Sequence, residues 1–218
     1  GRVVGTGTGW LGALQPEDRV DLIGPLGNWF RLPDDRCLGL LVGGGVGLPP
    51  MFYLAQALRA EGWDAIAFVG ALSRDLLAVT FAQDIEPNPQ GLPTLCVRQF
   101  AGFNYPTVIT TDDGSCGLRG RITAGLKGVL DGLSMDMIEK TVVFTCGPDR
   151  MMRQVAHMAE TCGVACQVCL EQAMACGMST CQSCVVRIDP RKYKPDLAES
   201  AHGSTPDGRP WRYRLACT

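Results

Sequence analysis

The sequence predicts an α/β fold of several parts, in which a parallel sheet is followed by a small cysteine-rich module. Short apolar runs alternate with segments of helical periodicity between residues 38 and 161, and that alternation is typical of a parallel sheet. Gly and Pro are abundant, at 27 and 14 residues, which suits a chain with many tight loops. From residue 166 onward the cysteines are closely spaced, which indicates a separate module.

The clearest strand and helix pair lies at residues 38–60. An apolar run at 38–42 ends in a glycine-rich turn at 43–47, with the sequence GGGVG. Two prolines follow, and then a segment of helical periodicity at 51–60. Strand, glycine turn, proline in the first helical turn and helix is the order of a βα unit.

The remaining elements follow from the same patterns. We predict strands at residues 65–69, 94–97, 107–111 and 142–145, and helices at 74–81, 122–130 and 149–161. Residues 1–32 are predicted as strands and turns, because 20–23 alternate and 24–28 are dense in turn-forming residues. The polar, proline-containing stretch at 189–210 is predicted as a loop.

Composition argues against two classes of partner. The net charge is -2 and the pI is about 5.7, so no basic field favours nucleic acid or an anionic membrane. No apolar run approaches the roughly 20 residues that a membrane span needs. The chain starts at Gly1 and stops at Thr218, and we expect it to be a fragment cut at both ends.

Three cysteines share one short segment. Cys176, Cys181 and Cys184 have the spacing Cys-x4-Cys-x2-Cys, which is typical of three ligands of a [2Fe-2S] cluster, and Cys217 supplies a fourth thiol. Two iron atoms held by one tight loop need closely spaced thiolates. The loop also needs small or turn-forming residues such as Gly177, so that backbone amides can point at sulfur and stabilise the negative charge of the cluster. The segment therefore predicts an electron-transfer centre.

Other interpretations of the cysteines remain open. Cys181 and Cys184 could be half of a zinc site, with Cys166 and Cys169 as a second close pair. A disulfide framework is disfavoured, because eleven cysteines is an odd number and a chain with 46% hydrophobic residues can build a core without crosslinks. Thiols and an iron-sulfur centre both favour a reducing compartment, and we predict a cytoplasmic location.

Two predicted strands end in motifs that would meet at one edge of the sheet. The glycine-rich turn contains Gly43, Gly44, Gly45 and Gly47, and the motif Cys146-Gly147-Pro148 ends a later strand. Ligands of open α/β sheets bind at the carboxyl ends of the strands, where a glycine turn lets the backbone approach phosphates. A purely structural turn and a buried structural cysteine are the alternatives. The repeated glycines at 5–9 and the turn at 112–115 have the same two interpretations.

Taken in order, these motifs resemble those of one family. They are Gly7-Thr8, GPLGN at 24–28, LVGGGVGLPP at 41–50, TDDGS at 111–115, TCGP at 145–148 and MACG at 174–177. The resemblance is to the electron-transfer subunits of class 1B dihydroorotate dehydrogenase, within the ferredoxin-NADP reductase superfamily. It runs over essentially the whole chain, and the three-cysteine loop is its most specific part.

The resemblance implies three parts and a role for each motif. Residues 1–34 would be the C-terminal part of an FAD-binding β-barrel, 35–163 an NAD-binding α/β domain and 164–218 a [2Fe-2S] domain. By the same resemblance, Gly7 and Thr8 contact the flavin, and Cys146 lies near the nicotinamide. The implied nucleotide contacts are Gly43, Gly44, Gly45, Gly47, Gly147 and Pro148, and the implied cluster ligands are Cys176, Cys181, Cys184 and Cys217.

In that family, FAD exchanges a hydride with NAD, and the cluster relays single electrons to a partner subunit that carries FMN. The partner oxidises dihydroorotate to orotate in pyrimidine biosynthesis, and the resemblance implies a heterotetramer. A diaphorase subunit serving a ferredoxin-NADP reductase, sulfite reductase or hydrogenase is the second hypothesis, and a metal-binding module without enzymatic activity is the third.

Two points stay open in the sequence. Arg74 follows the second strand, where a basic residue could meet the 2′-phosphate of NADP or simply face solvent. Ser179-Thr180 stands where the resemblance leads us to expect a second glycine, and we expect this to be tolerated only if that residue does not need a positive φ.

Overall fold

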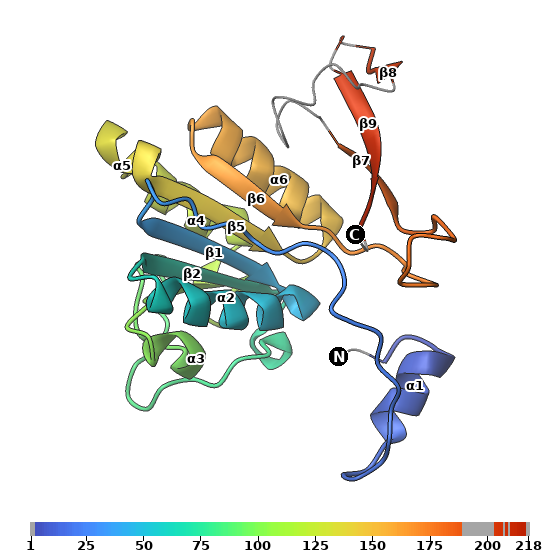
Figure 1. Cartoon of the computed structure of the whole chain (residues 1–218). Coiled ribbons are helices and arrows are strands. Elements are labelled where there is room, and N and C mark those ends of the chain that lie inside the picture. Colours follow the sequence, from blue (N-terminus) through green and yellow to red (C-terminus); the bar gives the residue numbers. More distant parts are fainter. Residues whose placement is uncertain (1–2, 189–202, 207, 209, 217–218) are drawn as a thin grey trace. The chain divides into compact units, whose positions relative to one another are not determined.

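A computed structural model describes residues 3–188, 203–206, 208 and 210–216 (Figure 1). The described chain divides into two compact units. The first contains Phe30–Cys169 with the described residues up to Thr8, and the second contains Gly9–Trp29 with the described residues from Leu170 onward. Each unit is described by itself.

A six-stranded parallel sheet forms the first unit, in the order β4-β3-β2-β1-β5-β6. The strands are β1 (Leu38–Gly44), β2 (Asp64–Ala71), β3 (Thr107–Thr111), β4 (Leu118–Arg119), β5 (Thr141–Cys146) and β6 (Ala165–Cys169). The predicted parallel α/β fold is confirmed. β3 and β5 are buried along their whole length, which explains why they appear in the sequence as continuous apolar or β-branched runs rather than alternating ones.

Helices cover both faces of this sheet. They are α2 (Leu48–Ala60), α3 (Arg98–Ala101), α4 (Ile122–Leu130), α5 (Met135–Lys140) and α6 (Asp149–Thr161), and short 3-10 turns lie at Gly45–Gly47 and Arg74–Leu76. Figure 1 shows α2 on one face and α4 and α6 on the other. Right-handed crossovers through these helices are what a parallel sheet requires.

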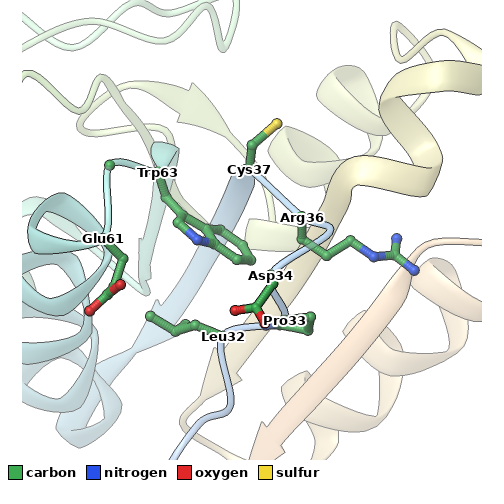
Figure 2. A pocket seen from close by; sticks show the side chains of 8 residues that line it. Leu32, Pro33, Asp34, Arg36, Cys37, Glu61 and Trp63 are labelled. Carbon is green, nitrogen blue, oxygen red and sulfur yellow. The ribbon is translucent and has the colours of Figure 1, made fainter.

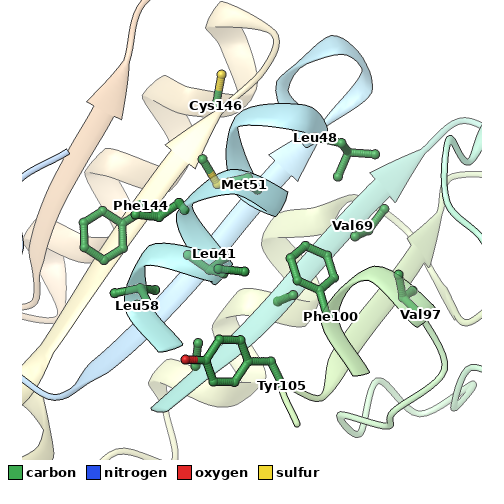
Figure 3. Packing of buried hydrophobic residues seen from close by; sticks show 14 of the residues in the cluster. Leu41, Leu48, Met51, Leu58, Val69, Val97, Phe100, Tyr105, Phe144 and Cys146 are labelled. Atoms are coloured by element: carbon green, nitrogen blue, oxygen red, sulfur yellow. The ribbon is translucent and has the colours of Figure 1, made fainter. Parts of the chain in front are cut away.

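The core consists of two layers, one on each face of the sheet. Leu41 and Phe144 pack with Met51 of α2 on one face (Figure 3). Their strand neighbours Leu40 and Val143 belong to the other layer, against α4 and α6. This alternation is the two-residue period of a strand expressed on two buried faces.

The second unit contains a small antiparallel sheet in the order β7-β9-β8. Its strands are β7 (Val185–Ile188), β8 (Gly203–Ser204) and β9 (Pro210–Leu215). The pairing continues beyond the strands, because the Ala216 amide donates to the Cys184 carbonyl at 3.0 Å. The last predicted cluster ligand of the loop is therefore held at the start of this sheet.

The predicted strands in the first 32 residues are wrong for the described part of that segment. Residues 3–37 contain no strand, and Thr6–Ala13 form helix α1. A strand needs a neighbour to satisfy its amides, and none pairs with this segment in the described chain. A helix satisfies its amides within the segment itself. The assignment of residues 1–34 to a flavin barrel stays a prediction.

Two predictions in the connection between β2 and β3 are also wrong. Residues 74–81 form only the short 3-10 turn at Arg74–Leu76, and Thr94 makes an isolated bridge to Thr107 rather than a strand. Four prolines, Pro87, Pro89, Pro93 and Pro106, lie in this connection. Proline has no amide to donate to a ladder, so regular pairing does not propagate.

The boundary predicted at residue 163 does not coincide with the end of the parallel sheet, since β6 lies beyond it. The assignment of the three predicted parts to FAD, NAD and a cluster stays a prediction. Among the described residues, no helix has the length and apolar character that a membrane crossing requires.

Candidate nucleotide and cluster sites

The strand order reverses between β1 and β5. From β1 the chain proceeds to β2 on one side, and from β5 it proceeds to β6 on the other. In open α/β sheets such a topological switch point is where ligands bind, outside the carboxyl ends of the strands. Gly43 of β1 lies in register with Cys146 of β5. The prediction that the two motifs share one edge of the sheet is confirmed.

The backbones of the two motifs approach each other closely at this edge. A Cβ atom on Gly47 would lie 2.1 Å from the carbonyl oxygen of Cys146. A Cβ atom on Gly147, which has φ +150°, would lie 2.8 Å from the carbonyl oxygen of Gly44. No side chain fits at either position, so glycine is required for the approach. The sequence pattern is thus explained by backbone contact between the two turns.

Two helices begin at the same edge. α2 starts at Leu48 directly after the glycine-rich turn, and α6 starts at Asp149 directly after Pro148. The first turn of α2 has no acidic residue and no side-chain cap, whereas Asp149 accepts a hydrogen bond from Arg153 at 2.9 Å in the first turn of α6. A helix N-terminus attracts anions. The start of α2 is therefore the better place for a phosphate.

The turns that follow β2 and β3 are connected by side chains. The Arg74 amide donates to Ser115 Oγ at 2.8 Å, and that hydroxyl donates to Asp113 at 2.6 Å. The Ser115 amide also donates to Asp113 at 2.9 Å, which is the predicted Asx-type turn. These two bonds from Ser115 hold the pKa of the Asp113 carboxyl below its ordinary value.

Arg74 has two further neighbours that sequence reasoning missed. Its guanidinium lies over the Phe81 ring at 5.2 Å from the ring centre, and its Nη1 lies 4.0 Å from Glu86 Oε2. Both partners come from the irregular connection after β2. No local pattern could have found them, because an irregular loop has no periodicity from which to infer contacts.

In the cysteine loop, backbone amides point at sulfur as predicted. Cys176 Sγ accepts from the amides of Met178 and Cys181, both at 3.4 Å, and Cys181 Sγ accepts from the amide of Ser183 at 3.5 Å. Such bonds stabilise negative charge on the sulfur atoms. Cys184 is buried, Cys176 is half-buried and Cys181 is exposed.

Ser183 lies against Cys181 and favours its thiolate form. Its hydroxyl lies 3.1 Å from Cys181 Sγ, and this contact, followed by the Ser183 amide and by Cys176, lowers the pKa of Cys181 from 9.0 to about 6. The thiolate is the form that binds metal. Ser183 Oγ is itself held by the Ala173 carbonyl at 3.0 Å and the Ala175 amide at 3.3 Å. Sequence reasoning missed this residue.

The loop requires positive φ angles. Gly177 has φ +65°, and Ser179 and Gln182 have φ +66° and +55°. The condition under which the absence of glycine would be tolerated, that the position needs no positive φ, is not met at Ser179. The turn must reverse direction between Cys176 and Cys181 within four residues, and a left-handed residue at 179 accomplishes this although a side chain is present.

The chemistry of the donor set fits a [2Fe-2S] cluster, because three closely spaced thiols lie in one loop. Among the described residues, no group of three His, Cys, Asp or Glu side chains converges to hold one ion. In a [2Fe-2S] cluster four cysteines share two irons, so three loop thiolates need not converge on one point. The fourth predicted ligand, Cys217, lies outside the described residues. Three closely spaced thiols with amides directed at sulfur are consistent with the cluster.

The second cysteine pair of the zinc hypothesis is wrong. Cys166 and Cys169 both lie on β6, three residues apart, so they face opposite sides of the sheet. Cys166 packs against the core layer of α4 and α6, and Cys169 packs against the layer of α2. Two thiols on opposite faces do not form a close ligand pair.

Gly7 and Thr8 lie in helix α1. Thr8 Oγ1 accepts hydrogen bonds from the amides of Val4 at 2.9 Å and Gly5 at 3.1 Å. The hydroxyl thus satisfies amides at the helix start. Contact of these two residues with a flavin stays a prediction.

A shallow pocket lies at the opposite edge of the sheet (Figure 2). It has a volume of about 210 Å³ and is lined by Leu32, Pro33, Asp34, Arg36, Cys37, Glu61, Gly62 and Trp63. Cys37 precedes β1 and Trp63 precedes β2, so the pocket is at the amino ends of the strands. Nucleotides bind at the carboxyl ends, and this pocket is therefore not the nucleotide site.

Known proteins of one name are similar to this chain. No protein-family model matches the chain. It is 34% identical over 187 residues to the dihydroorotate dehydrogenase B (NAD(+)) electron transfer subunit of Desulforamulus reducens, and 35% identical over 189 residues to that of Geobacillus thermodenitrificans. Each match covers 86% of this chain and 63% of the relative. The chain is similar to these electron-transfer subunits over most of its own length. It spans slightly less than two thirds of their length.

A solved structure is also similar to this chain. A NADH-dependent reduced ferredoxin-NADP oxidoreductase, described in connection with flavin-based electron bifurcation, matches with a TM-score of 0.68 and 26% identity over 86% of this chain and 60% of that one. The parallel sheet with its switch point is thus similar in fold to that oxidoreductase.

Proposed function

We propose that this chain is the larger part of an electron-transfer subunit of NAD-linked dihydroorotate dehydrogenase. Electrons from a partner subunit that holds FMN and oxidises dihydroorotate would pass through a [2Fe-2S] cluster and FAD to NAD, in pyrimidine biosynthesis. The observation that carries the proposal is the similarity over 86% of the chain to subunits of this one name. The geometry of the switch point and of the cysteine loop supports it independently.

The residues at the switch point would hold the pyridine nucleotide. Gly44, Gly47 and Gly147 keep the two turns free of side chains, so that backbone can lie against the pyrophosphate and the nicotinamide. The uncapped start of α2 would stabilise phosphate charge. Cys146, which is only 2% exposed, would border the nicotinamide and exclude water from it. The bound NAD supplies hydride chemistry.

The cysteine loop would hold the cluster, which supplies one-electron transfer when bound. Cys176, Cys181 and Cys184 provide three thiolates, with Cys217 as the proposed fourth. The amides of Met178, Cys181 and Ser183 direct positive dipoles at the sulfur atoms. They would stabilise the more negative state of the centre and so set its potential.

The remaining parts of the proposal concern the assembly. Residues 1–34, with Gly7 and Thr8, would complete a flavin-binding barrel with segments that correspond to the rest of the relatives' length. The partner would be the FMN-containing catalytic subunit, in a heterotetramer, in the cytoplasm. A two-electron hydride donor and a one-electron cluster require a flavin between them, which is why we include FAD.

The test uses the full-length protein that contains this chain, co-expressed with a candidate FMN-containing partner and purified without oxygen. We expect dihydroorotate-dependent reduction of NAD, and its loss in a Cys181→Ser variant. Cys162→Ser, which removes a thiol at the end of α6, is the matched control and should keep the activity. An unchanged rate in Cys181→Ser would contradict the proposed role of the loop.

A second candidate is a diaphorase subunit that serves another electron acceptor. The similarity to the NADH-dependent reduced ferredoxin-NADP oxidoreductase favours it. In that case NADH would reduce the flavin and the cluster, while dihydroorotate with the partner would deliver no electrons. A preparation without flavin or iron-sulfur absorption bands would contradict both candidates.

A further inference from the structure

The last rung between β5 and β6 pairs two cysteines. In the register of these parallel strands, Cys146 is opposite Cys169. Both side chains belong to the core layer on the α2 side of the sheet, in which Cys146 is buried and Cys169 is partly buried and packs against the cluster. No role in the proposed electron route requires Cys169.

The general spacing of neighbouring strands lies within the range of Cα separations found in disulfides. Neighbouring strands lie about 4.7–4.9 Å apart, and disulfides form between Cα atoms about 4.4–6.8 Å apart. Both residues end their strands, so no further rung fixes the backbone beyond them and small adjustments of the Cβ atoms are possible. Side chains at opposed positions of one rung also point to the same face.

We propose that Cys146 and Cys169 form a redox-sensitive dithiol that a small-molecule disulfide oxidises to an intramolecular disulfide. The two thiols differ in access, because Cys146 is 2% exposed whereas Cys169 is half-buried. Cys169 would therefore react first. Its thiolate attacks one sulfur of the small disulfide, which forms a mixed disulfide and releases one thiolate of the reagent.

Cys146 then completes the exchange. Its thiolate attacks the Cys169 sulfur of the mixed disulfide, and the second half of the reagent leaves as a thiolate. The two protein thiols lose two electrons and their protons, and the reagent gains both electrons as it becomes two thiols. Reduction by an added dithiol reverses the step.

The crosslink would act on the switch point. Cys146 is followed by Gly147, and the carbonyl of Cys146 is in contact with Gly47. A sulfur bonded toward β6 changes the end of β5, where the two glycine turns meet, and also removes the thiol from the proposed nicotinamide position. We expect the crosslinked protein to lose the reduction of its flavin by NADH. This consequence rests on the proposed function, whereas the formation of the crosslink does not.

The experiment treats the full-length protein with oxidised glutathione in the absence of oxygen. Remaining thiols are alkylated, and mass spectrometry of the peptides looks for the Cys146–Cys169 crosslink. In parallel, NADH-dependent flavin reduction is followed. We expect loss of this activity in proportion to the crosslinked fraction, and recovery with dithiothreitol. Cys169→Ser should keep activity throughout, and Cys169→Ala repeats the test with a different side chain.

Cys166→Ser is the matched control, because it removes a thiol from the same strand but from the opposite face, and it should behave as the wild type does. Glutathione found on Cys169 without a crosslink would overturn the proposal, as would equal loss of activity in the two Cys169 variants. If the untreated protein does not react with NADH, the proposed function is wrong. The mass of the crosslinked peptides still shows whether the Cys146–Cys169 disulfide forms.

Discussion

Ser179 shows at the scale of one residue how the cysteine loop is built. It has φ +66°, a conformation that costs an L-residue roughly 1–2 kcal/mol. The neighbouring amides of Met178 and Cys181 donate to Cys176 Sγ, so the backbone on both sides is fixed by sulfur contacts. These contacts keep Ser179 in its strained conformation, which a glycine at this position would adopt without strain.

Ser179→Gly should therefore stabilise the protein. We expect the midpoint of thermal unfolding to rise by a few degrees, which corresponds to about 0.5–1 kcal/mol after the greater freedom of glycine in the unfolded chain is included. Thr180→Gly is the control, because residue 180 is not among those with positive φ, and it should lower the midpoint. A decrease in both variants would show that residue 179 is not strained.

Glu86 is expected to influence the choice between NADH and NADPH. Its carboxylate lies near Arg74. Arg74 follows the end of β2, where a basic residue would meet a 2′-phosphate. A carboxylate there opposes a phosphate, and exposed charge pairs contribute about 0.2–1 kcal/mol, so Glu86→Gln should raise the ratio of kcat/KM for NADPH to that for NADH roughly two- to fivefold. Steady-state kinetics of flavin reduction give this ratio.

Asp84→Asn controls for a general change of charge in the same loop. Asp84 has φ +59°, which asparagine also tolerates, and no contact of Asp84 with Arg74 is among the described ion pairs. An equal rise of the ratio in both variants would mean that Glu86 acts only through long-range charge.

At the scale of elements, sequence patterns located the segments that pack against the sheet. The helix predicted at residues 149–161 coincides with α6, and the strand predicted at 38–42 is β1 without its last two glycines. Burial imposes a helical period on α6 and a continuous apolar run on β1. Thr6–Ala13 has no buried residue, so its sequence has no such period, and its helix could not be predicted.

The two glycines of α4 provide a matched test at this scale. A Cβ on Gly128 would meet nothing within 4 Å, whereas a Cβ on Gly125 would lie 2.8 Å from Val108 Cγ1 in the sheet. Gly128→Ala should raise the free energy of unfolding by about 0.5–1 kcal/mol, because alanine is the better helix former. Gly125→Ala should lower it by about 1–3 kcal/mol through overpacking.

Urea unfolding of both variants measures the difference. The change in amino acid is identical and the helix is the same, so helix propensity cancels between them. Equal stabilisation by both substitutions would mean that α4 can move away from β3 at no cost, and the close contact with Val108 would then not be a constraint on the packing.

At the scale of the whole molecule, topology explains how much of the site was predictable. Parallel strands bring their carboxyl ends to one edge, so the meeting of the glycine-rich turn with Cys146 follows from the order of elements. The pairing of Cys146 with Cys169 depends on the register of β5 and β6. Register is set by packing of the complete sheet, and no local segment contains it.

The buried thiols also make the stability of the whole molecule depend on pH. Desolvation by burial raises the pKa of Cys96 and of Cys116 above the ordinary value of 9.0. The same effect raises the pKa of Tyr105 above 10.0. Cys96 Sγ donates to the Thr107 carbonyl at 3.9 Å, and the Tyr105 hydroxyl donates to the Trp63 carbonyl at 2.6 Å. Both donors require the protonated group.

The sign of the effect follows from proton counts. Between pH 9.0 and the raised pKa of Cys96, the unfolded chain has released the thiol proton and the folded chain retains it. The unfolded state binds fewer protons, so the free energy of unfolding falls as pH rises. The contribution of each thiol is fully present below pH 9.0 and is lost above it, and that of Tyr105 is lost above pH 10.0.

We therefore expect these groups to leave the free energy of unfolding, measured by urea unfolding, constant up to about pH 9. Above that pH the free energy of unfolding should fall by at most about 1.4 kcal/mol per pH unit for each group. Cys96→Ala lowers stability at neutral pH through the cavity it leaves, but it should flatten the alkaline slope. Cys37→Ala, at an exposed position, should leave the slope as in the wild type. If the free energy of unfolding of Cys96→Ala falls with pH as steeply as that of the wild type between about pH 7 and 10.5, the burial of this thiol does not cause the loss of stability at alkaline pH.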